Sequence, residues 1–174
     1  RLYSPAEMGE WGVFSSCASI LAVIGCLRYE NAIVKPSRRV DAYNLAFVSI
    51  LIALAFTGCL YLIVFAVDIF RFNHWFSLGR EALYILPFYV LCLLLIQILN
   101  NLANKTQQYR SLAFSSVGRS LTQAISRITL GYCSFTNVGL IAGANTGALF
   151  QVFLLSIRLR LKHFFLRTFS FKRA

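Results

Sequence analysis

Acidic residues are scarce in this chain of 174 residues, which has 6 Asp and Glu against 17 Lys and Arg. The six acids lie near the ends of apolar stretches and form no DxD motif and no metal-binding pair, and the chain has no phosphate-binding loop. Membrane-bound transferases usually need such groups, so the sequence argues against an enzyme. The six are Glu7, Glu10, Glu30, Asp41, Asp68 and Glu81.

Histidine and cysteine offer equally little chemistry. The two histidines, His74 and His163, are isolated, and the 5 cysteines show no CxxC spacing. Most of the cysteines lie inside apolar stretches, where a small buried hydrophobic role is the expected one. We therefore predict neither a metal site nor a cofactor.

Long apolar stretches, by contrast, fill the chain, in which 58% of residues are hydrophobic. A helix needs roughly 20 residues to cross the hydrocarbon core of a bilayer, which is about 30 Å thick. Five stretches are of about that length, so we predict an all-α polytopic transmembrane helix bundle of about five spans within residues 1–157. The expected helices cover about 5–27, 41–70, 81–103, 111–130 and 138–157.

The net charge of +11 would favour nucleic acid as the partner of a soluble protein. In a membrane protein, cytoplasmic loops collect Lys and Arg, so we expect membrane lipids and no nucleic acid. Twelve of the 17 basic residues lie in alternate connections, which places the N-terminal end outside and residues 158–174 in the cytoplasm. That basic segment is either an interfacial amphipathic helix or a plain cytoplasmic loop. An outside start without a signal pattern also indicates a missing upstream span.

Stretch 111–130 has a polar face. At 100° per residue its polar side chains fall within about 160°. A charge at the depth of Arg119 costs at least about 2.5–3.5 kcal/mol, so Arg119 should face a wet cavity or a partner. For Arg127, which is close to the outer end, the sequence favours snorkelling to the headgroups over a functional role. Two guanidinium groups on a polar stripe suit a phosphate. The face comprises Ser115, Ser116, Arg119, Ser120, Thr122, Gln123, Ser126 and Arg127.

Two further patterns concern packing. Gly139, Gly143 and Gly147 form a GxxxGxxxG row, on which another helix of the bundle can approach closely. Amide side chains recur at helical spacing before residue 109, and they can bridge helices or hydrogen-bond sugars. These amides are Gln97, Asn100, Asn101, Asn104 and Gln108.

The chain resembles the N-terminal half of bacterial O-antigen and capsule oligosaccharide flippases, which belong to the multidrug/oligosaccharidyl-lipid/polysaccharide exporter superfamily. The resemblance covers essentially all of the chain as an ordered set of segments. These are RLYSPAEMG at 1–9, LRYENAIVKP at 27–36, AYNL at 42–45, NLANKTQQYR at 101–110 and GLIAG at 139–143.

The resemblance implies one partial lobe of a two-lobe fold, and translocation of an undecaprenyl-pyrophosphate-linked oligosaccharide across the bacterial inner membrane by alternating access. The N-terminal end would be periplasmic, and the remaining helices of the full-length chain would complete the transporter. Arg28 and Arg119 would receive the pyrophosphate, with Arg127 as a further cation. Glu30 would pair with Arg28, and Gln123 would contact sugar or phosphate.

Two alternatives to a flippase remain from the residues themselves. An ion-coupled exporter of small organic cations or drugs would need buried carboxylates, whereas the buried charges expected here are cationic. A non-transporting membrane subunit would use Arg119 only to hold a partner. Replacing Arg119 would then affect assembly and leave export intact.

Overall fold

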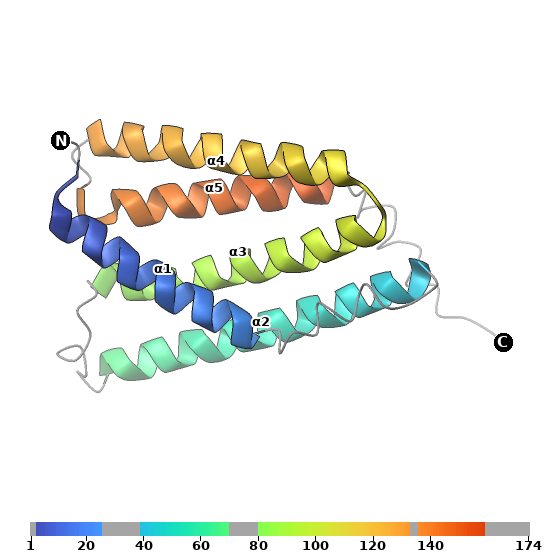
Figure 1. Cartoon of the computed structure of the whole chain (residues 1–174). Coiled ribbons are helices and arrows are strands. Elements are labelled where there is room, and N and C mark those ends of the chain that lie inside the picture. The colour runs from blue at the N-terminus through green and yellow to red at the C-terminus, as the bar shows by residue number, and fades with distance from the viewer. Residues whose placement is uncertain (1–2, 26–38, 70–79, 133–135, 159–174) are drawn as a thin grey trace.

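The computed structural model describes residues 3–25, 39–69, 80–132 and 136–158. These residues form five α-helices and no strand, which confirms the predicted all-α helix bundle (Figure 1). The helices are α1 (Pro5–Gly25), α2 (Arg39–Ile69), α3 (Arg80–Lys105), α4 (Tyr109–Tyr132) and α5 (Thr136–Arg158).

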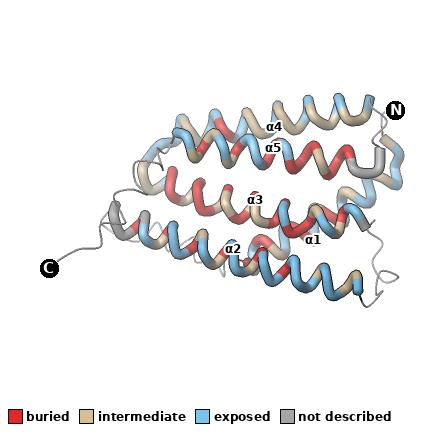
Figure 2. The backbone as a smooth tube through the Cα atoms, turned by 180° about the vertical axis from the view of Figure 1, so that it is seen from behind, coloured by how far each residue is buried: buried red, intermediate tan, exposed pale blue. Residues whose placement is uncertain are grey.

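Four of the described helices, α1, α2, α3 and α5, are long and apolar enough to cross a membrane. This is the pattern of a multi-pass membrane protein. Helix α4 has 24 residues, which is enough length, but its polar face lowers its hydropathy. Helix α4 runs alongside the apolar helix α5 in both views of the backbone, so the two helices lie in the same layer of the bundle (Figures 1 and 2).

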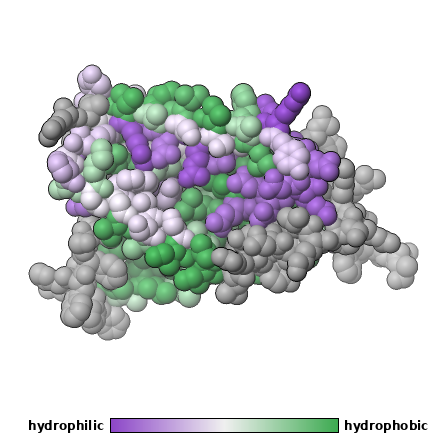
Figure 3. All heavy atoms as spheres, viewed as in Figure 1, coloured by the Kyte–Doolittle hydropathy of each residue, from purple (hydrophilic) through white to green (hydrophobic). Residues whose placement is uncertain are grey.

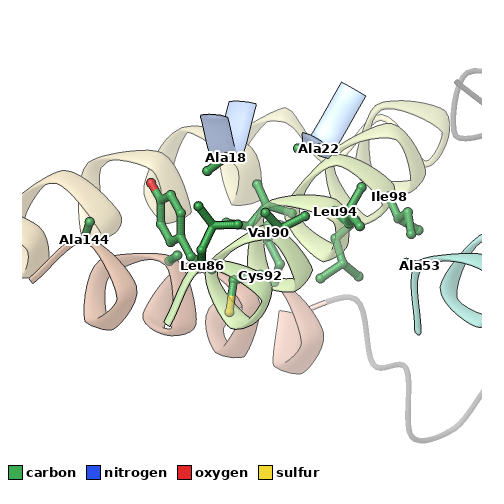
Figure 4. Packing of buried hydrophobic residues seen from close by; sticks show 14 of the residues in the cluster. Ala18, Ala22, Ala53, Leu86, Val90, Cys92, Leu94, Ile98 and Ala144 are labelled. Carbon is green, nitrogen blue, oxygen red and sulfur yellow. The ribbon is translucent and has the colours of Figure 1, made fainter. Parts of the chain in front are cut away.

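Helix α3 lies at the centre of the bundle and carries much of the buried surface (Figure 2). Its large side chains, such as Val90, Leu94 and Ile98, pack against alanines of the surrounding helices (Figure 4). Small residues allow helix backbones to approach closely, which is how helices associate in lipid. The alanines are Ala18 and Ala22 of α1, Ala53 of α2 and Ala144 of α5, each at most 2% exposed.

The start of α1 is a capping box. The backbone N–H of Ser4 donates to Glu7 Oε2 at 2.7 Å, and the backbone N–H of Glu7 donates to Ser4 Oγ at 3.3 Å. Pro5 occupies the first helical position, where its missing N–H costs nothing. These bonds fix the start of α1 at Pro5.

A tight turn joins α3 to α4. The N–H of Gln108 donates to the carbonyl of Ala103 at 3.0 Å, and the N–H of Gln107 donates to that of Asn104 at 3.1 Å. Gln107 adopts a left-handed φ of 58°, the conformation that ends a helix with this bond pattern. The chain thus reverses within a few residues, and α4 returns antiparallel to α3.

The ends of the helices alternate between two sides of the bundle. Tyr3 lies against Gly131 and Gly139, so the start of α1 shares a side with the connection between α4 and α5. The turn between α3 and α4 lies at the opposite side, together with Arg158 at the end of α5 (Figure 1). The basic segment predicted at 158–174 lies, beyond Arg158, outside the described residues.

Candidate functional site

The polar face of α4 packs against the glycine row of α5. A Cβ added to Gly143 would lie 2.7 Å from Cγ of Arg127, and one added to Gly147 would lie 2.9 Å from Cβ of Gln123. Only glycine permits this approach, so the predicted close contact is confirmed and its partner is α4. We call this contact the α4–α5 seam. It consists of Arg119, Gln123, Arg127 and Leu130 of α4 and Gly139, Gly143 and Gly147 of α5.

The opposite face of α4 is apolar and exposed. Its side chains have the composition of a lipid-facing surface. The predicted polar face is at least partly buried except at Ser116 and Ser120, which are exposed. The exposed residues are Phe114, Val117, Leu121, Ile125 and Ile128.

Arg119 is half-buried in the seam and donates from Nη1 to Oε1 of Gln151 at 3.2 Å. Gln151 belongs to α5 and is 4% exposed. Within the described part of the chain, no carboxylate forms an ion pair with Arg119. Since a neutral amide supplies a dipole and no charge, the positive charge of Arg119 stays uncompensated by these residues.

Arg127 is held inside the bundle by α1. Its guanidinium carbon lies 4.6 Å from the centroid of the Trp11 ring, a cation–π contact. Its Nε and Nη2 are buried and have no hydrogen-bond acceptor. Trp11 in turn packs against Phe14 and Tyr89, with ring centroids 5.8 and 6.2 Å away. The alternative in which Arg127 snorkels to the headgroups is therefore not observed.

Tyr3 fastens the start of α1 to the same region. Its hydroxyl donates to the backbone carbonyl of Arg127. Burial raises the pKa of the Tyr3 phenol above 10.0, although the positive charge of Arg127 opposes this rise.

Hydrophilic residues also gather on the face that is seen in Figure 3, between the apolar outer side of α4 and the apolar surface around α2. Gln97 and Asn100 of α3 belong to the amides singled out from the sequence. Three buried amide oxygens accept no hydrogen bond, namely Oε1 of Gln97, Oδ1 of Asn100 and Oδ1 of Asn145 on α5. The polar character of the bundle therefore extends from α4 to α3.

Of the sequence-predicted site residues, Arg119, Gln123 and Arg127 share the α4–α5 seam. Arg28 and Glu30 lie outside the described residues. Among the described residues, no three His, Cys, Asp or Glu side chains come together in a way that would hold a metal ion.

Sequence reasoning missed three residues of the site, Gln151, Trp11 and Tyr3. Gln151 had a detectable signal, because it interrupts an otherwise apolar run from Ala148 to Leu155. Nothing in the local sequence marks Trp11 or Tyr3 as neighbours of a residue more than 100 positions away. Their contact with Arg127 depends on how α1 crosses the bundle.

Comparison with known proteins adds no relative. No protein-family model, no curated protein and no solved structure matches the chain.

Proposed function

We propose that this chain is part of a transporter that moves an undecaprenyl-pyrophosphate-linked oligosaccharide across the bacterial inner membrane by alternating access, for O-antigen or capsule assembly. The observation that carries the proposal is the half-buried Arg119, whose described hydrogen-bond partner is a neutral amide. A charge inside an apolar bundle costs several kcal/mol on insertion scales, at least about 2.5. A mobile anionic substrate is the partner that offsets this cost when it binds.

The chemistry of the guanidinium fits a phosphate. Arg has five N–H donors in a planar fork, and the bond to Gln151 uses one nitrogen, Nη1. The other donors of Arg119 match the oxygens of a phosphate, which guanidinium groups bind in pairs of parallel hydrogen bonds. A low-dielectric surrounding strengthens that attraction compared with water.

Arg127 offers a second cation two turns further along α4. Eight residues of helix separate it from Arg119, or about 12 Å along the axis. That separation exceeds the length of a pyrophosphate, so the two cations form successive stations rather than one site. The donors available at the second station are Nε and Nη2 of Arg127, which have no acceptor in the described structure.

A second candidate is a non-transporting membrane subunit, and a specific observation favours it. The hydrogen bond between Arg119 and Gln151 joins α4 to α5, which is what a purely structural arginine would do. An exporter of organic cations has less support. Within the described helices, the acids with described side chains, Glu7, Glu10, Asp68 and Glu81, lie near helix ends.

The test compares both partners of this hydrogen bond in the full-length protein, expressed in cells from which the native gene has been deleted. Arg119→Ala should abolish surface glycan, whereas Gln151→Ala should preserve it, because the positive charge stays. Arg119→Lys keeps the charge but not the fork, and should restore part of the display. Membrane levels of each variant, measured by immunoblot, serve as the control for folding.

The subunit alternative predicts a different pattern. Arg119→Ala and Gln151→Ala would then reduce membrane levels alike, since each removes the same interhelical bond. Normal glycan display from well-expressed Arg119→Ala would rule out a role for this guanidinium in transport.

A further inference from the structure

Helix α3 carries a face of amide side chains next to the point where the described part of α1 ends. Gly25, the last described residue of α1, lies against Leu94, about one turn before the first of these amides. At 100° per residue the four amides within the helix fall within an arc of about 100°. We call them the amide face, which consists of Gln97, Asn100, Asn101 and Asn104.

Two oxygens of the amide face have no hydrogen-bond partner. Oε1 of Gln97 and Oδ1 of Asn100 are buried, and neither accepts a bond. Neither oxygen therefore bridges helices within the described bundle. A buried carbonyl without a donor is unfavourable in an apolar surrounding, so the arrangement fits a partner that supplies hydroxyl or N–H donors.

The amide face begins at the level of Arg119. Because a short turn joins α3 to α4, residues equally far from that turn lie at similar depth. Arg119 is ten residues after the start of α4, and residue 95 is ten residues before the end of α3. From this level the four amides extend about 10 Å toward the turn.

We infer that the amide face binds the sugar residues of the lipid-linked substrate whose phosphate Arg119 receives; this inference rests on the proposed function. A carboxamide presents both an acceptor oxygen and an NH₂ donor, and a sugar hydroxyl is likewise donor and acceptor. Neutral amides recognise sugars without attracting other anions. Figure 3 shows hydrophilic residues on one face of the bundle, between the apolar outer side of α4 and the apolar surface around α2.

The experiment measures binding to the purified full-length protein in lipid nanodiscs. Two probes are used, which are bare undecaprenyl pyrophosphate and lipid-linked oligosaccharide extracted from the host membranes. The double variant Gln97→Ala/Asn100→Ala should weaken binding of the oligosaccharide-linked probe about tenfold or more and leave that of the bare lipid unchanged. Arg119→Gln should weaken binding of both probes. Asn44→Ala, which removes an exposed amide of α2, is the matched control and should change neither.

The outcomes separate this inference from the proposed function. If the double variant binds both probes as wild type does, the amide face does not bind sugar, and the phosphate site stands. If the double variant binds both probes more weakly and unfolds at a lower temperature, the amides are structural and the inference fails. If the wild-type protein binds neither probe, the proposed function fails, and the inference fails with it.

Discussion

Replacing Gly147 with alanine tests the α4–α5 seam directly. The added Cβ would lie 2.9 Å from Cβ of Gln123 and 3.1 Å from the backbone oxygen of Arg119. Carbon atoms pack best at about 3.5–4.0 Å, so the helices would have to separate by about half an ångström or more. Neither contacting atom is the far end of a flexible side chain. The backbone of α4 must therefore move, and the bond from Arg119 to Gln151, already 3.2 Å long, must lengthen.

Two opposing effects set the magnitude. Overpacking a close contact costs about 1–3 kcal/mol. Alanine in place of glycine inside a helix gains about 1 kcal/mol in propensity. Gly58 of α2 isolates the second effect, because a Cβ added there meets nothing within 4 Å. Gly147→Ala should thus be about 1–3 kcal/mol less stable than Gly58→Ala, while Gly58→Ala should be more stable than wild type.

The assay is equilibrium unfolding in mixed detergent micelles, followed by helical circular dichroism as the share of SDS is raised. Each variant is compared with wild type under the same conditions. Equal stability of Gly147→Ala and Gly58→Ala would mean that α5 does not contact α4 closely at this position.

Three more predictions concern the ends of the bundle. Tyr3→Phe should lower the free energy of unfolding by about 1 kcal/mol through loss of its hydrogen bond. Because folding raises the pKa of Tyr3, the stability that its phenol contributes is fully present below pH 10 and is lost as the pH rises further. The free energy of unfolding, measured as a function of pH, should fall in this range for wild type and fall less for Tyr3→Phe. Trp11→Leu should lower the free energy of unfolding by about 0.5–2 kcal/mol beyond the loss of packing, because it removes the cation–π contact with Arg127. A double-mutant cycle with Arg127→Gln should measure a coupling energy of that size, whereas additive effects of the two substitutions would exclude the contact. Gln107→Gly should stabilise the turn by up to about 1 kcal/mol in thermal unfolding, since glycine adopts its φ of 58° freely; lower stability would contradict this.

Much of the fold could be predicted because length and polarity alone decide it. A run of apolar residues long enough to cross a bilayer must form a helix, since no other open backbone satisfies its hydrogen bonds in lipid. Ser4 and Glu7 marked the start of α1 for an equally local reason. The glycine row of α5 predicted a close contact, but several helices could have supplied the other side. The choice of α4 depends on three-dimensional packing.

The sequence predicts that the polar side chains of α4 share one arc of the helix, but it does not predict which residues lie opposite them. The pattern shows that Arg119 avoids lipid, but it does not say whether cavity, carboxylate or amide lies opposite. The structure supplies Gln151, which the sequence marks only as a polar residue in an apolar helix. Pairing across more than 30 positions depends on the register between α4 and α5, which small residues at Gly143 and Gly147 set.

The two arginines of the seam look alike in the sequence, and the structure separates them. Arg127 has an aromatic ring against its guanidinium and a phenol on its backbone carbonyl, so both contacts tie it to α1. Arg119 has a single described amide acceptor. Any movement that displaces α1 from the seam would expose the charge of Arg127. The guanidinium of Arg119 can bind an anion without such a movement, because no described contact ties it to α1. If the proposed function holds, a phosphate that travels along α4 would therefore meet Arg119 first and reach Arg127 only after α1 has shifted, which would give the two proposed stations an order.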